Sequence, residues 1–63
     1  MRPETAEERA LSDALAAWVA SAEACARAGV PGAVTLEIHQ APGKPRAWAV
    51  IAPDRTVLAV GEA

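Results

Sequence analysis

The residue best suited to acid–base chemistry is His39, the only histidine of this 63-residue chain. It stands two residues after Glu37, so both side chains would lie on the same face of an extended strand. A carboxylate next to a histidine can orient the ring for proton transfer. Thr35 carries the only hydroxyl expected on that face, and no activated nucleophile accompanies the pair. We therefore interpret His39 and Glu37 as ordinary surface residues and keep them only as weak candidates for a functional site.

The other reactive and basic side chains do not predict a second site. Cys25 is the only cysteine, so no disulfide forms within the chain, and a helix C-terminus disfavours its thiolate. Lys44 and Arg46 flank Pro45 and could contact a phosphate, but a solvated turn is the simpler interpretation. A structural zinc site takes about four ligands, and this chain offers only Cys25 and His39, in different elements. We expect no metal, no cofactor and no enzymatic activity.

The residues before Gly29 have the composition and periodicity of one long amphipathic helix. Thr5 and Glu8 form a capping-box pattern at its start, and Gly29 followed by Pro31 marks its end. We expect a helix over about residues 6–28. The large apolar side chains recur at helical spacing and predict the face that packs on the core. This predicted core face consists of Leu11, Leu15, Trp18, Ala22 and Cys25, widened by Ala14, Val19 and Ala26.

The same helix face permits a second interpretation, in which it forms a seam between the helices of two copies. Its side chains taper from large at Leu11, Leu15 and Trp18 to small at Ala22 and Ala26. Small residues allow a close approach either to a sheet or to another helix. We expect the core interpretation, because an apolar stripe on a helix usually faces the interior of its own chain.

Three short runs rich in β-branched residues follow the helix and predict strands at about 33–40, 46–52 and 56–60. Turns containing proline separate them, at 41–45 and 53–55. Such short connections favour an antiparallel meander with the second strand in the centre. The predicted fold class is α+β, with one long N-terminal helix packed on a three-stranded antiparallel meander (αβββ) in a single domain spanning residues 1–63.

The composition narrows the classes of protein to consider. Hydrophobic residues make up 52% of the chain and the formal charge is −2. The apolar content argues against intrinsic disorder, and the absence of a basic surplus argues against a nucleic-acid partner. The longest apolar run has about nine residues, far short of the roughly 20 that span a membrane, and acidic residues precede it where a signal peptide would be basic. We expect a cytoplasmic protein, and the usage of Ala, Arg, Gly and Pro suggests a bacterial or phage origin.

The second and third strands are apolar on both faces, although one helix can cover only one face of a sheet. If Trp48 and Val50 face the helix, then Ala49 and Ile51 face away. Either Leu58 with Val60, or Val57 with Ala59, would join them on that outer face. An uncovered apolar face beside an uncharged edge strand favours association. We therefore predict a small non-enzymatic interaction module whose partner is a second copy or another protein. The candidate interface consists of Ala49, Ile51, Leu58 and Val60.

A different class of function stays open as an alternative. The order of one helix and three strands resembles the first part of the double-stranded-RNA-binding fold and of small toxin ribonucleases that share it. Those toxins carry Gly-Ser/Thr-His where this chain has Glu37, Ile38 and His39, and they expect a basic surface. The chain is therefore assigned to no family. The alternative is a toxin-like or nucleic-acid-acting small protein that uses His39 with Lys44 and Arg46.

Overall fold

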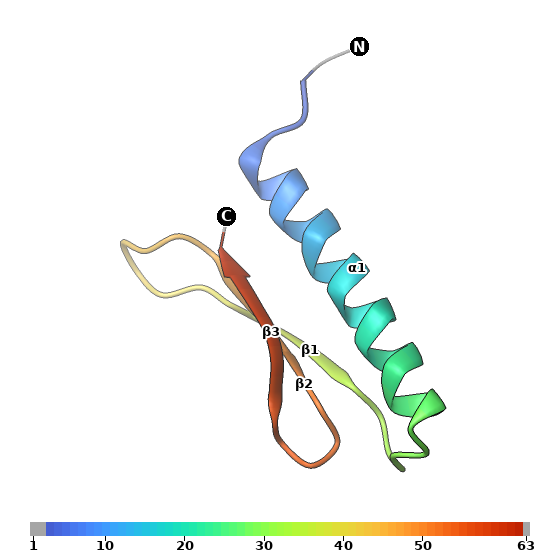
Figure 1. The fold of residues 1–63 in the computed structure, drawn as a ribbon. Helices are drawn as coiled ribbons and strands as arrows, with labels where there is room; N and C mark the ends of the chain where they lie inside the picture. The colour runs from blue at the N-terminus through green and yellow to red at the C-terminus, as the bar shows by residue number, and fades with distance from the viewer. Residues whose placement is uncertain (1–2, 63) are drawn as a thin grey trace.

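The computed structural model describes residues 3–62 and contains one helix followed by a three-stranded sheet. Helix α1 spans Ala6–Arg27, and the strands are β1 (Thr35–His39), β2 (Ala47–Ile51) and β3 (Val57–Glu62). The strands are antiparallel in the order β1-β2-β3, and α1 lies against one face of the sheet (Figure 1). This arrangement confirms the predicted α+β fold of αβββ order.

Both ends of α1 are closed by the residues that the sequence predicts. The Thr5 hydroxyl accepts a hydrogen bond from the Glu8 backbone N–H at 3.1 Å and donates one to the Glu8 carboxylate. At the other end, Gly29 adopts a left-handed φ of 72°. The Val30 N–H then bonds the Cys25 carbonyl at 3.0 Å and the Gly29 N–H bonds the Ala26 carbonyl at 3.1 Å. This is the hydrogen-bond pattern of a Schellman motif, which satisfies carbonyls that the helix end leaves open.

The turn between β2 and β3 holds a strained residue. The Arg55 N–H bonds the Ala52 carbonyl at 2.9 Å, and Arg55 itself has a φ of 76°. The Asp54 carboxylate accepts the Thr56 N–H at 3.0 Å. Hydrogen bonds from the Thr56 side chain and backbone hold the pKa of Asp54 below its ordinary value of 3.8. The turn therefore depends on a side-chain cap and tolerates a non-glycine residue in the left-handed region.

Arg55→Gly should stabilise the fold, because glycine adopts a positive φ without the Cβ strain of about 1 kcal/mol that arginine incurs. The greater freedom of glycine in the unfolded chain offsets part of this gain. We expect a net increase of about 0.5 kcal/mol in the free energy of unfolding, measured by urea denaturation at a fixed protein concentration. Thr56→Gly, one residue further along, is the control and should destabilise. A loss of stability in Arg55→Gly would contradict the turn geometry.

The register of the strands decides which side chains face the helix. Leu36 pairs with Val50 and Ile38 with Trp48, while on the other side Val50 pairs with Ala59 and Trp48 with Gly61. Residues directly opposite one another in an antiparallel sheet point to the same face. Val50 is fully buried, so this is the face that α1 covers. The inner face is formed by Leu36, Ile38, Trp48, Val50, Ala59 and Gly61.

A register shift beside Val50 and Ile51 gives the outer face a different pair of β3 residues from either of the two pairs that the sequence suggested. Ile51 pairs with Val57, whereas its neighbour Val50 pairs with Ala59. A residue inserted in one strand resets the alternation beyond it. The outer face consequently receives both Val57 and Val60, and Leu58 falls at the irregularity. The outer face is formed by Thr35, Glu37, His39, Ala47, Ala49, Ile51, Val57, Val60 and Glu62.

The helix face that packs on the sheet is not the one predicted. Ala10 and Ala14 are the buried residues of α1, and Ala17, Ser21 and Cys25 are half-buried. Ala14, at the margin of the predicted core face, is buried and Cys25 is half-buried, but the rest of that face is exposed. The prediction was therefore wrong by roughly a quarter turn of the helix, since neighbouring residues are about 100° apart.

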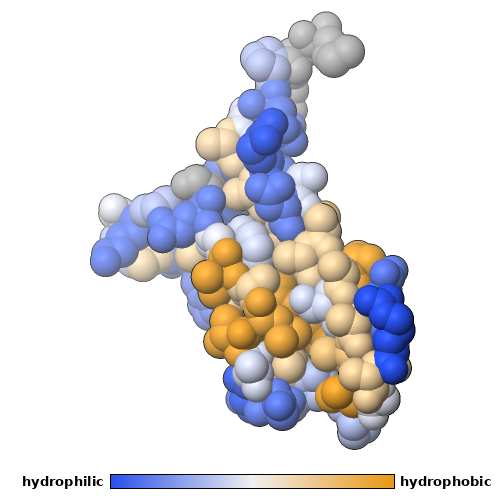
Figure 2. All heavy atoms as spheres, in the orientation of Figure 1, coloured by the Kyte–Doolittle hydropathy of each residue, from blue (hydrophilic) through white to orange (hydrophobic). Residues whose placement is uncertain are grey.

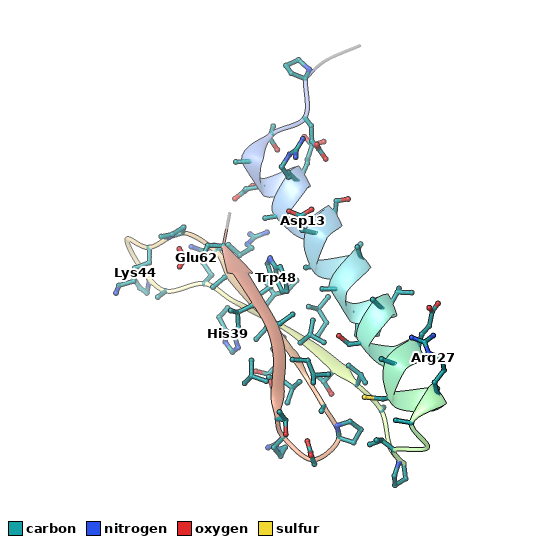
Figure 3. The ribbon with its side chains drawn as sticks, in the orientation of Figure 1. Asp13, Arg27, His39, Lys44, Trp48 and Glu62 are labelled. Atoms are coloured by element: carbon teal, nitrogen blue, oxygen red, sulfur yellow. The ribbon has the colours of Figure 1, made fainter. Side chains whose placement is uncertain are left out.

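Trp48 supplies the physical reason for this rotation. Its indole lies between the sheet and α1 (Figure 3), next to Ala10 and Ala14. A Cβ added at Gly61 would overlap the indole ring. The ring therefore occupies the space above β3 that a side chain at Gly61 would otherwise fill. The helix residues beside the ring that face the sheet are the small Ala10 and Ala14, which are buried, while Leu11 and Leu15 are exposed.

Candidate functional site

The interface residues predicted from the sequence lie on β2 and β3. Ala49 and Ile51 belong to the outer face and are half-buried, while Val60 is 69% exposed on the same face. Leu58 is also exposed, at the register shift. Figure 2 shows the corresponding hydrophobic surface over β3. The outer face is therefore an apolar strip, and Glu37, His39 and Glu62 lie on it as well.

A second apolar surface lies on α1, where the sequence interpretation had placed the core. Leu11, Leu15, Trp18 and Val19 are between 39% and 53% exposed. Ala22 and Ala26 continue the row toward the end of the helix and are exposed too. The term helix stripe is used below for Leu11, Leu15, Trp18, Ala22 and Ala26. The sequence did carry a pattern that could have revealed which face of α1 packs on the sheet. The small residues of that face also recur at helical spacing, at Ala10, Ala14, Ala17 and Ser21.

Trp18 is held in place at the centre of the helix stripe. Its indole N–H donates a hydrogen bond to the Val34 carbonyl at 2.9 Å, just before β1 begins. This bond satisfies the one polar atom of the indole, so the exposed part of the ring is entirely apolar. A ring that is already fixed loses little conformational entropy when a partner covers it.

Two hollows lie at opposite ends of the helix stripe. The first, of about 180 Å³, lies at the start of α1 and has Leu11, Ile38 and Trp48 in its wall, with Arg46 at the same site. The second, of about 290 Å³, lies at the end of α1 between Trp18, Ala22 and Ala26 and the segment 32–34. Both hollows include residues of β1 or of the segment leading into it, so both adjoin the same edge of the sheet. The surface is thus a ridge with a depression at each end.

His39 and Glu37 form the pair that their spacing predicts. The His39 Nε2 atom lies 3.0 Å from the Glu37 Oε1 atom on the outer face, where His39 is largely exposed and Glu37 is half-buried. His39 points away from the helix (Figure 3). The pair lies on the open outer face, where His39 borders a shallow hollow.

The structure separates the basic residues from His39. Lys44 lies at the tip of the loop between β1 and β2 (Figure 3), and its carbonyl accepts a hydrogen bond from the Gln40 side chain at 2.8 Å. Arg46 donates from its Nε atom to the Gln40 side chain at 3.3 Å and lines the first hollow, on the helix side. His39 borders a hollow on the outer face. The three side chains do not converge on one site.

Other kinds of site find no support in residues 3–62. No group of three or more His, Cys, Asp or Glu side chains in that range could hold a metal ion. Cys25 is a free, half-buried thiol. Helix α1 lacks the apolar length that crossing a membrane requires. No family model matches the chain, and searches of curated proteins and of solved structures returned no match.

Proposed function

We propose that this chain is a small non-enzymatic interaction module that associates with a second copy of itself. The observation that carries the proposal is the distribution of its apolar side chains. Within residues 3–62 only Ala10, Ala14, Val50 and Ala52 are buried, and Val50 is the only large one. At least nine large apolar side chains of the same range are exposed. Contiguous exposed apolar surface of this kind marks an interaction site.

The exposed area supports the same proposal. A monomer of 6.5 kDa is expected to expose about 3,800 Å², and this chain exposes 4639 Å². The excess, about 800 Å², is close to what each partner buries in an interface of standard size. The radius of gyration, 13.1 Å, also exceeds the roughly 10.6 Å expected of a compact domain of this length. The surplus surface that the chain exposes is therefore about as large as the area that one partner buries in a dimer of standard size.

A second copy is the occupant that needs the fewest assumptions. Small domains without disulfides or metals usually gain stability from a partner chain, and two-fold homodimers are the commonest oligomers. Both the outer face and the helix stripe are available for the contact. Within residues 3–62 no group of three or more His, Cys, Asp or Glu side chains could hold a metal in place of a partner.

Sedimentation equilibrium at micromolar concentrations tests the proposal. We expect a mass twice the 6.5 kDa of one chain, with a midpoint of thermal unfolding that rises with protein concentration. A chain that sediments as a monomer throughout this range, with a midpoint independent of concentration, would overturn the proposal.

A further inference from the structure

We propose that the helix stripe, rather than the sheet, is the seam of the dimer, with two copies of α1 packed antiparallel about a two-fold axis. This inference rests on the proposed function, because it names the surface through which the second copy binds. In this arrangement Leu11 of one chain packs on Ala26 of the second copy, Leu15 packs on Ala22, and Trp18 lies beside Val19 near the axis.

The side chains themselves favour the stripe over the outer face. The stripe presents one tryptophan and two leucines, and tryptophan is among the residues that contribute most to binding energy. It carries no charged residue along its length. The apolar residues of the outer face are mostly Ala and Val, and Glu37 lies directly opposite Ala49 in the sheet. Packing two outer faces together would bring carboxylates out of water, which costs free energy unless each finds a partner.

The taper of the stripe favours the antiparallel direction. Large side chains occupy its first half, at Leu11, Leu15 and Trp18, and only alanines occupy its second half. An antiparallel pair places the large half of each helix against the small half of the other. The hollow beside Ala22 and Ala26 lies where the leucines of the second copy would arrive. A parallel pair would instead set leucine against leucine at one end and leave the hollows facing each other.

The charges at the helix ends agree with this direction. Glu7 and Glu8 lie in the first turn of α1, and Arg27 lies in the last. The antiparallel pair brings the acidic turn of one helix level with the basic turn of the other and opposes the two helix dipoles. The Arg27 side chain is largely exposed, and its contact with Glu23, at 4.0 Å, is at the limit of an ion pair. Arg27 lies nine residues after Trp18, on the opposite side of α1, so the end charges favour this direction through the helix dipoles and not through a direct contact of Arg27.

The test compares two adjacent substitutions that introduce the same charge. Leu15→Glu places a carboxylate in the seam, whereas Ala16→Glu places it on an exposed part of α1 outside the stripe. We expect Leu15→Glu to raise the dissociation constant of the dimer about 30-fold or more, with an unchanged far-ultraviolet circular dichroism spectrum. Ala16→Glu should change the dissociation constant of the dimer less than threefold. Val60→Lys, on the outer face, should also change it less than threefold. The measurement is sedimentation equilibrium on each full-length variant.

The outcomes separate this inference from the proposed function. If the unmodified chain is a dimer and the Leu15→Glu variant dimerises with the same dissociation constant, the helix seam is wrong. If Val60→Lys dissociates the dimer while Leu15→Glu does not, the contact is on the sheet and the proposed function stands. A monomeric unmodified chain overturns the proposed function itself.

Cross-linking tests the direction of the helices without relying on a disruptive variant. In a Cys25→Ser background, Val19→Cys should form a disulfide between two copies under mild oxidation, because this position lies near the two-fold axis. Leu11→Cys and Ala26→Cys should each cross-link poorly alone but readily when the two variants are mixed. Efficient cross-linking of Leu11→Cys with itself would indicate a parallel pair and contradict the arrangement.

Discussion

Trp48→Ala should remove about half or more of the folding stability of the chain at 25 °C. Truncating a packed tryptophan costs about 3–5 kcal/mol, and a chain of this length has only about 3–9 kcal/mol of stability in total. The indole lies between the sheet and α1, where it borders the first hollow together with Ala10 and Ala14. No other aromatic side chain of residues 3–62 lies in that space, since Trp18 is bound at Val34. Circular dichroism with urea titration measures the loss, and Trp18 remains as a fluorescent reporter.

The partner of Trp48 in this contact is Gly61, and a double-mutant cycle isolates the pair. Gly61→Ala alone should destabilise by about 1–3 kcal/mol, because the added Cβ would overlap the indole. In a Trp48→Leu background, which keeps part of the fold stability, the same change should cost much less. Additive effects of the two substitutions would show that the ring does not lie over Gly61.

Ala14→Leu should destabilise the fold by about 1–3 kcal/mol, although leucine is a good helix former and the change increases hydrophobicity. Ala14 is 1% exposed and lies against the sheet beside Trp48. A longer side chain there pushes α1 away from the sheet or displaces the indole. Urea denaturation at a fixed protein concentration measures the change in the free energy of unfolding.

Ala16→Leu is the matched control for this prediction. Ala16 is exposed on the same helix two residues further on, so the identical substitution should change stability by less than about 0.5 kcal/mol. Together the two variants test how α1 is rotated. If Ala14→Leu were neutral or stabilising, the face predicted from the sequence, with Leu15 and Trp18 toward the sheet, would be the correct one.

The elements and their boundaries could be predicted because local interactions decide them. The Thr5 cap and the Gly29 stop act within a few residues, through hydrogen bonds that the sequence specifies directly. The turn at Pro53 and Asp54 is likewise local. The alternation in β1 places His39 beside Glu37 wherever that strand forms. These features required no knowledge of what packs above or below them.

The candidate site was predicted only in part. The sequence correctly indicated more apolar surface than one helix covers, and Val60 is indeed highly exposed. It located the helix stripe and offered a seam between two copies as a second interpretation, but preferred the core, because periodicity alone identifies an apolar face without saying what that face contacts. It also could not foresee the register shift that turns Val57 and Val60 to the same side of the sheet. That shift depends on how β3 meets β2 and not on β3 alone.

By itself the sequence determined one capped helix, three strands, their antiparallel order and a surplus of apolar side chains. The tertiary structure decided which of two faces of α1 meets the sheet, and therefore where the surplus lies. The physical reason is steric. With Trp48 over Gly61, α1 approaches the sheet through the small Ala10 and Ala14, and Leu11 and Leu15 remain at the surface.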